Sequence, residues 1–142
     1  MKWIALAFAL LVTGPALAQG APPPVRATAI TPTPDDRAKQ WLTLVDDGNY
    51  ADSYKQMGAQ ATAKISAADW TQKVSSVRMP LGAMSSRNLK NVKMSKTLPG
   101  APDGQYATIR YDSAFAHKAA AVETVILASG KDGWSVIGYF IN

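Results

Sequence analysis

The chain has 142 residues with 15 lysines and arginines against 10 aspartates and glutamates, which gives a formal net charge of +5 at pH 7. It contains no cysteine, and this excludes disulfide bonds, thiol catalysis, cysteine metal sites and the diacylglycerol anchor of bacterial lipoproteins. The moderate positive charge favours solubility and a weak attraction to anionic surfaces or ligands, and it says nothing about the fold.

Residues 1–18 have the three parts of a secretory signal peptide. Lys2 precedes the apolar run Trp3–Val12, and Ala16-Leu17-Ala18 is a small-residue cleavage site. The run is far shorter than the ~20 residues that a membrane-spanning helix needs. We therefore expect cleavage after Ala18, no retained membrane span, and a mature protein in the periplasm or outside the cell. In that compartment we expect an unknown small ligand or an envelope protein as partner, and no nucleic acid.

Residues 19–34 are rich in proline, with Pro22-Pro23-Pro24, Pro32 and Pro34 and few large apolar side chains. Proline favours an extended, poorly packed chain. We therefore expect a disordered linker in front of a single domain at residues 35–142. A polyproline ligand for another protein is the alternative interpretation.

The first helix is predicted from an apolar face at helical spacing. The residues on that face are Ala38, Trp41, Leu42 and Val45. Asp35 or Asp36 is expected to cap its start, and Gly48 supplies the left-handed stop at its end. Trp41 is expected to anchor the core.

Two further helices follow. Tyr50–Met57 repeats the helical spacing after a tight turn. A third helix begins at Ser66, with Asp69 three residues on in a capping-box-like arrangement, and Trp70 belongs to its apolar stripe as a second core anchor. Pro80 ends this helix because proline lacks the backbone N–H that a helix needs.

The remainder has the pattern of antiparallel strands. Strands are expected at residues 83–97, 105–115, 119–129 and 134–141, with a turn cluster at 98–104 and a hairpin turn at 130–133. Helices that precede a run of such strands predict the α+β class. We expect the N-terminal helices to pack on one face of a curved antiparallel sheet of about four strands.

The last two strands are apolar on both faces. A sheet covered by helices on one side only should have a polar second face. The second face is therefore expected to be covered, either by curvature of the sheet or by another subunit in a homodimer. The other interpretation is that strand-forming residues are apolar in any setting.

Several motifs recur in the order typical of a family of secreted bacterial proteins. They are Trp41-Leu42-x-Leu-Val-Asp-x-Gly-x-Tyr, Trp70, Val77-Arg78-x-Pro-Leu-Gly, Ser86-Arg87, Leu98-Pro99-Gly100-Ala101-Pro102-Asp103-Gly104-x-Tyr106, Tyr111, Phe115, Glu123-Thr124-Val125 and Trp134-x-Val-x-Gly-Tyr139. Over residues 38–142 the chain resembles the family catalogued as domain of unknown function 4019. The resemblance implies a domain of this size behind a signal peptide and transfers no catalytic residue. The helices and terminal sheet also resemble the cystatin-like cone of nuclear transport factor 2, a fold that hosts enzymes, binding modules and dimerisation modules alike.

The sequence holds little recognisable catalytic apparatus. His117, the only histidine, falls in the expected turn between two strands, where nothing fixes it for general-base or metal chemistry. Asp46-Asp47-Gly48-Asn49 lacks the ligand spacing and the closing glutamate of a calcium loop. A Walker loop, a Gly-x-Ser-x-Gly elbow and a dinucleotide fingerprint are missing as well. We expect no cofactor and no metal.

Arg110 and Glu123 are the strongest candidate pair. A two-residue turn would place Phe115 opposite Lys118, and Arg110 would then lie opposite Glu123 on the next strand. With Tyr106 on the same face, Arg110 and Glu123 form a candidate ligand-binding site at the floor of a cavity. The simpler interpretation is a structural ion pair worth ~1 kcal/mol or less. A register change of one residue would put the pair on opposite faces.

Basic residues recur at every third position along the first expected strand. They are Arg87, Lys90, Lys93 and Lys96. This spacing divides them between the two faces of a strand, and lysines on an edge strand discourage aggregation. Weak binding to anionic envelope polymers is the alternative interpretation.

The sequence leaves three functions open. The first is a non-catalytic exported module that binds a ligand or a protein through a sheet-lined concavity. The second is a small cone-fold isomerase or hydrolase with Glu123 as base and Tyr106 or Arg110 as electrophile, which requires a raised pKa of Glu123 in a dry pocket. The third is a structural homodimer whose sheet faces pack together.

Overall fold

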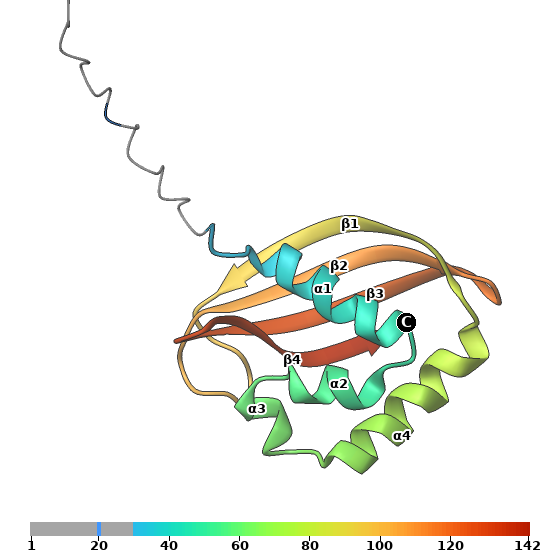
Figure 1. The fold of residues 1–142 in the computed structure, drawn as a ribbon, viewed down its shortest axis with the longest axis horizontal. Coiled ribbons are helices and arrows are strands. Elements are labelled where there is room, and N and C mark those ends of the chain that lie inside the picture. Colours follow the sequence, from blue (N-terminus) through green and yellow to red (C-terminus); the bar gives the residue numbers. More distant parts are fainter. Residues whose placement is uncertain (1–19, 21–29) are drawn as a thin grey trace, which may run out of the picture.

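The computed structural model describes residue 20 and residues 30–142 of the chain. The expected signal peptide at residues 1–18 and most of the expected linker at residues 19–34 lie outside the described residues. The helices come first and the strands follow (Figure 1), which confirms the α+β class. No helix within residues 30–142 is long and apolar enough to cross a membrane.

Helices make up the first layer of the fold. They are α1 (Pro34–Asp46), α2 (Tyr50–Lys55), α3 (Ala59–Thr62) and α4 (Ala67–Arg78), and the 3-10 turn η1 (Met79–Leu81) continues from α4. The sequence pattern does not predict α3, because a helix of 4 residues is too short to show a helical period. Pro80 lies inside η1, so the chain leaves the α-helical geometry close to the expected stop.

The start of α1 is fixed by Thr33, so the expected cap at Asp35 or Asp36 is wrong. The Thr33 hydroxyl accepts a hydrogen bond from the Asp36 backbone N–H at 3.2 Å, and the Asp36 carboxylate accepts one from the Thr33 backbone N–H at 3.1 Å. This reciprocal pair is a capping box. Pro34 takes the first helical position, where its missing N–H would have had no partner within the helix.

Two tryptophans hold the helices together. Trp41 of α1 donates its indole N–H to the Ser53 carbonyl at 2.9 Å, and Trp70 of α4 donates to the Ser53 hydroxyl at 3.0 Å. The two rings lie 5.8 Å apart, and both are buried. The prediction that they anchor the core is confirmed.

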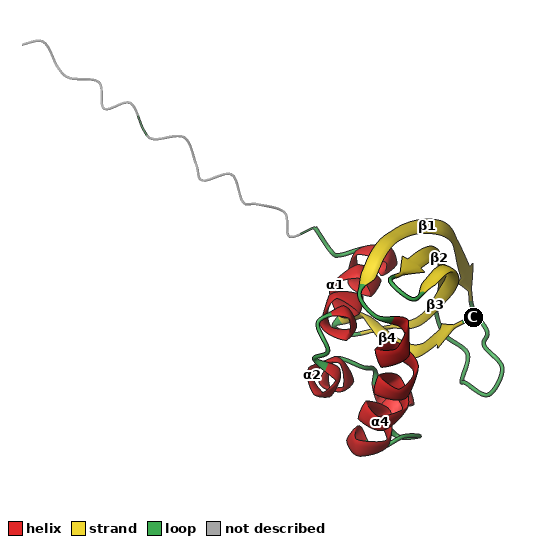
Figure 2. Ribbon diagram, turned by 90° about the vertical axis from the view of Figure 1, so that its right-hand side faces the viewer, coloured by secondary structure: helices red, strands yellow, loops and turns green. Residues whose placement is uncertain are grey.

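The second layer is an antiparallel sheet whose strands follow one another in chain order. They are β1 (Met84–Ser95), β2 (Tyr106–Phe115), β3 (Lys118–Gly130) and β4 (Gly133–Ile141). The helix α1 packs mainly on β2, β3 and β4, and β1 arches along the outer edge of the sheet (Figure 2). The predicted curved sheet with helices on one face is confirmed.

The core lies between the helical layer and the facing side of the sheet. It contains Ala38, Trp41, Leu42, Val45, Met57, Ala61, Trp70, Val74, Ala107, Ile109, Tyr111, Val125, Leu127 and Val136. The apolar face predicted for the first helix is buried in full. The alternate residues Ala107, Ile109 and Tyr111 of β2 are buried as well.

A bulge beside the turn between β2 and β3 changes the pairing that the sequence predicts. Phe115 lies opposite Lys118 as expected, and β3 then has one extra residue before regular pairing resumes. Tyr111 rather than Arg110 therefore lies opposite Glu123. The predicted pairing of Arg110 with Glu123 is wrong, because a shift of one residue places the two side chains on opposite faces of the sheet.

Candidate functional site

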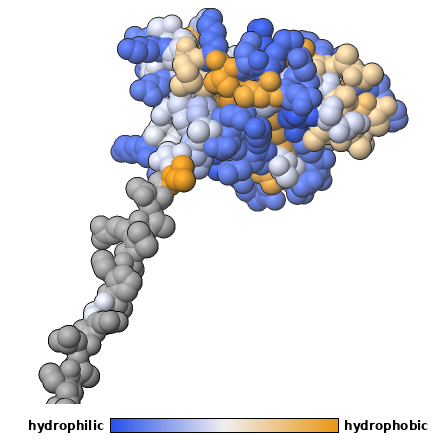
Figure 3. All heavy atoms as spheres, turned by 90° about the horizontal axis from the view of Figure 1, so that it is seen from above, coloured by the Kyte–Doolittle hydropathy of each residue, from blue (hydrophilic) through white to orange (hydrophobic). Residues whose placement is uncertain are grey.

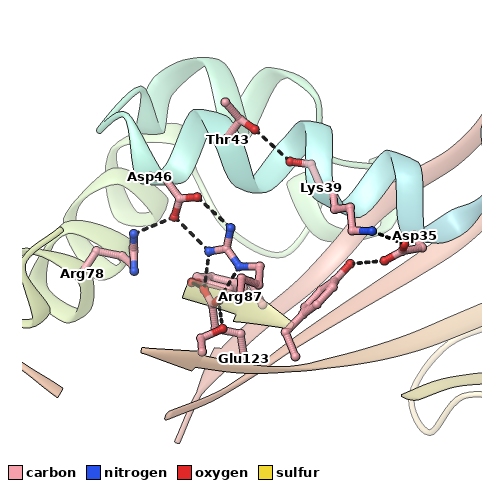
Figure 4. A network of polar contacts seen from close by, with 10 residues as sticks. Asp35, Lys39, Thr43, Asp46, Arg78, Arg87 and Glu123 are labelled. Carbon is pink, nitrogen blue, oxygen red and sulfur yellow. Dashed lines mark hydrogen bonds and ion pairs between the residues drawn. The ribbon is translucent and has the colours of Figure 1, made fainter. Parts of the chain in front are cut away.

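Charged side chains from four different elements meet between the helices and the sheet (Figure 4). Asp46 ends α1, Arg78 ends α4, Arg87 lies on β1 and Glu123 lies on β3. We call these residues, together with Ser113 and Tyr139, the buried polar network.

Arg87 is the hub of the buried polar network. Its guanidinium donates to Glu123 through Nε at 2.6 Å and Nη2 at 3.0 Å. On its other side it donates to Asp46 through Nη1 at 2.7 Å and Nη2 at 2.9 Å. Both contacts are two-pronged, the geometry in which a guanidinium binds a carboxylate most specifically.

Glu123 is completely buried, and all of its acceptor positions are in use. Besides Arg87, its carboxylate accepts a hydrogen bond from the Ser113 hydroxyl at 2.5 Å and one from the Tyr139 hydroxyl at 2.6 Å. Each carboxylate oxygen thus has two donors. No lone pair is left pointing at open space where a substrate would bind.

Burial by itself would raise the pKa of Glu123, but the hydrogen bonds and charge of Arg87, with the hydroxyls of Ser113 and Tyr139, bring that pKa below its ordinary value. Burial and the adjacent Glu123 charge raise the pKa of Tyr139, which keeps its hydroxyl protonated as a donor. A general base needs a pKa near the working pH. Glu123 in this arrangement does not provide the base that an isomerase or hydrolase requires.

Arg78 closes the network at the end of α4. It donates to Asp46 through Nη2 at 2.7 Å, and its guanidinium carbon lies 4.4 Å from the centre of the Phe115 ring. Its Nε and Nη1 have no hydrogen-bond partner among the described residues. Two arginines and two carboxylates balance in charge, so the network as a whole is neutral.

The three residues predicted to form a ligand site do not come together. Glu123 is in the buried polar network on the helix side of the sheet, whereas Arg110 is exposed and pairs with Thr124 on the opposite face. Tyr106 is buried at the far end of β2, where its hydroxyl donates to the Pro102 carbonyl at 2.6 Å.

The actual partners of Glu123 had only weak signals in the sequence. Arg87 is the one arginine in an otherwise lysine series, and arginine is the residue that can bridge two carboxylates. Asp46 belongs to the segment Asp46-Asp47-Gly48-Asn49, which lacks the ligand spacing of a calcium loop. Both lie far from Glu123 along the chain, so only the fold brings them together.

A groove runs between α4 and β4 beside the buried polar network. It has a volume of about 300 Å³ and is lined by Ile65, Trp70, Lys73, Val74, Val77, Tyr139, Phe140, Ile141 and Asn142. Val77 and Phe140 are 47% and 54% exposed at its rim. Tyr139 lines the groove and also donates to Glu123, so the groove and the network share a side chain. We call this feature the α4–β4 groove.

Residues 30–142 contain no group of three or more histidine, cysteine, aspartate or glutamate side chains placed to hold a metal ion. His117 lies exposed in the turn between β2 and β3 as predicted. Its Nδ1 is 3.2 Å from the Pro80 carbonyl oxygen, a contact that fixes the turn against η1.

The sequence profile described as "Protein of unknown function (DUF4019)" matches residues 37–139. The chain belongs to the DUF4019 family. The matched region begins inside α1 and ends inside β4. It contains the whole buried polar network, whereas the groove also includes Phe140, Ile141 and Asn142 beyond its end. A comparison with curated proteins finds no match for the sequence.

A solved structure that resembles this DUF4019 domain is titled as a putative NTF2-like transpeptidase from Campylobacter jejuni. The two share 18% sequence identity with a TM-score of 0.54, and the alignment covers 74% of this chain and 97% of the other. At that identity the likeness concerns the fold. It confirms the expected resemblance to nuclear transport factor 2, and the transpeptidase description stays with the Campylobacter protein.

Proposed function

We propose that this protein is an exported, non-catalytic binding module whose ligand site is the α4–β4 groove. The observation that carries the proposal is the complete engagement of Glu123 by Arg87, Ser113 and Tyr139. The carboxylate of Glu123 is fully occupied by donors from within the protein, and the apolar surface of the α4–β4 groove is left open next to it. A rigid polar interior next to an exposed apolar groove is typical of a preformed binding site.

The lining of the α4–β4 groove specifies the chemistry of the ligand. Its sides are mainly aliphatic and aromatic, and Lys73 is the one side chain with a charge among the residues that line it. Lys73 forms no ion pair within the described part of the chain. An apolar body with an anionic head group fits both features, because the body would cover Trp70 and Phe140 while the head group reaches Lys73.

Dodecanoate below its micelle concentration is a simple probe of this chemistry. Calorimetric titration should show saturable binding that Val77→Glu weakens at least tenfold, because the new carboxylate enters the apolar rim and repels the anion. Met79→Glu is the matched control, since Met79 is 73% exposed and does not line the groove. Equal weakening by the two substitutions, or no binding by the unmodified protein, would remove the groove from consideration.

Export is part of the same proposal and is supported by the signal-peptide pattern of residues 1–18. Mass spectrometry of the protein recovered from a cell fractionation should give a chain that begins at Gln19, in the periplasmic or extracellular fraction. Recovery of the uncleaved chain from the cytoplasm would contradict both the processing and the location.

A homodimer is a second candidate, favoured by the outer face of β3 and β4. Phe140 is 54% exposed there, and Ile126 is only partly buried. Packing a second copy on this face would cover both side chains. Light scattering after size exclusion tests this directly: a monomer mass at micromolar concentration counts against it, and a dimer that Phe140→Ser dissociates supports it.

A further inference from the structure

The strand β1 has one free edge. It pairs only with β2 in the sheet that residues 30–142 form, and the helix α1 packs mainly on the other three strands. Its 12 residues therefore leave a row of backbone N–H and C=O groups on the outer side without strand partners. Such an edge is a template for the addition of another strand.

Three large apolar side chains lie along this edge strand on the side that faces the helices. Leu89, Val92 and Met94 are 47%, 41% and 54% exposed, although the residues opposite them on β2 are buried in the core. The bulge between Leu89 and Asn91 keeps Leu89 and Val92 on one face despite their odd spacing. Figure 3 views the molecule from above, where β1 lies, and shows hydrophobic surface framed by hydrophilic surface.

The same strand is strongly basic. Residues 84–102 contain Arg87, Lys90, Lys93 and Lys96 and no aspartate or glutamate. Lys90 binds the exposed Asp112 at 2.9 Å, while Lys93 and Lys96 form no ion pair in the part of the chain that the structure describes. Pairing of two β1 strands would bring like charges together, which disfavours a second copy as the occupant.

We propose that the free edge of β1 binds an extended acidic segment of another envelope protein as a fifth strand. The backbone edge supplies hydrogen bonds, the exposed apolar residues take alternate side chains of the added strand, and the two unpaired lysines select acidic neighbours. A lipid surface would satisfy the lysines and the apolar residues but would leave the backbone groups unpaired. The proposal concerns a surface separate from the α4–β4 groove and does not depend on it.

Edge protection alone explains the lysines but not the apolar residues between them. Natural sheets blunt their edges with charge, bulges, short strands or covering segments, and β1 has both charge and bulges. Here the edge strand is long, and its apolar side chains are left at the surface. A partner strand accounts for the two features together.

The test uses nitrogen-15-labelled protein, purified as it accumulates in the cell, and an eight-residue peptide of alternating glutamate and valine with blocked ends. Amide resonances of residues 84–95 should shift on titration, and their hydrogen exchange should slow. A peptide with lysine in place of glutamate is the matched probe and should bind at least tenfold more weakly. Shifts centred on the α4–β4 groove, or equal binding of the two peptides, would overturn the proposal.

Two double variants distinguish binding at the edge of β1 from a general attraction between the acidic peptide and the basic protein. Lys93→Glu with Lys96→Glu should weaken binding of the acidic peptide at least tenfold, because both side chains are exposed and unpaired. Lys118→Glu with Lys131→Glu changes the net charge by the same amount, at the first residue of β3 and in the turn after it, and should have little effect. Equal losses in both double variants would overturn the proposal, and so would binding to phosphatidylglycerol vesicles through residues 84–95 without binding of the peptide.

Discussion

Strand β1 carries basic side chains into two opposite settings. Near its start, the Arg87 side chain is 10% exposed and bridges Asp46 and Glu123. Further along, Lys93 is exposed and has no ion pair within residues 30–142. The sequence alone groups these residues as one periodic series, and the fold separates them into a buried structural hub and an open surface.

The contrast shows how the surroundings of a charge decide its role. A buried charge must be matched by partners because its desolvation is costly, and the planar guanidinium of Arg87 can match two carboxylates at once. An exposed ammonium group stays hydrated and contributes little to the free energy of unfolding. The buried polar network therefore holds the frame together, whereas the lysines of β1 remain available to a partner.

Removal of the hub should have the largest effect on stability. Arg87→Met leaves Asp46 and Glu123 without the cation that bridges them, and we expect the free energy of unfolding to fall by about 3–5 kcal/mol. Lys93→Met, the same change in the exposed setting, should alter it by less than about 0.5 kcal/mol. Urea unfolding followed by circular dichroism measures both variants. Similar losses of stability in the two would contradict the contrast between a buried Arg87 and an exposed Lys93 on β1.

Loss of a single donor to Glu123 should have a smaller effect. Tyr139→Phe removes the hydroxyl that lies 2.6 Å from the carboxylate, and a hydrogen bond to a charged group contributes about 1.5–3 kcal/mol. Tyr50→Phe is the control, because its hydroxyl has no hydrogen-bond partner among the described side chains and backbone. Thermal unfolding of both variants gives the comparison, and a Tyr139→Phe protein as stable as the control would weaken the assigned role of the network.

The pH dependence of stability should also report on the network. The pKa of Glu123 is lower in the folded protein than its ordinary value of 4.5, so its contribution is complete above that value and is lost as the pH falls through the folded pKa. The free energy of unfolding should decrease with acidification below about pH 4.5. Glu123→Gln should flatten this decrease, and a slope that this substitution leaves unchanged would contradict the assigned role of Glu123.

The local features of the fold were readable from the sequence. The helical face around Trp41, the strands and the left-handed turn at Gly48, which has φ of +75°, all follow from patterns within a short stretch of chain. The candidate site was harder to predict from the sequence. The pairing of Arg110 with Glu123 assumed an unbroken register, and the extra residue in β3 beside the turn is set by local backbone geometry that periodicity does not encode.

The partners of Glu123 depend on contacts between distant segments. Arg87 lies 36 positions from Glu123 and 41 from Asp46, and no short-range pattern links them. Alternation along β3 also could not identify Glu123 as buried, because apolar residues occur on both faces of this strand. Only the packing of α1 and β1 around β3 shows which charges meet.

The smallest expected effect on stability is that of the exposed ion pair between Lys90 and Asp112. This pair also gives the most direct comparison between an exposed and a buried ion pair of β1. Its N–O distance of 2.9 Å is close to the 2.7 Å between Arg87 and Asp46, but its side chains are 48% and 55% exposed. A double-mutant cycle with Lys90→Met and Asp112→Asn should give a coupling energy of at most ~1 kcal/mol that falls further in 1 M salt. A large coupling energy that is insensitive to salt would mean that distance, rather than burial, determines the strength of the ion pairs in this sheet.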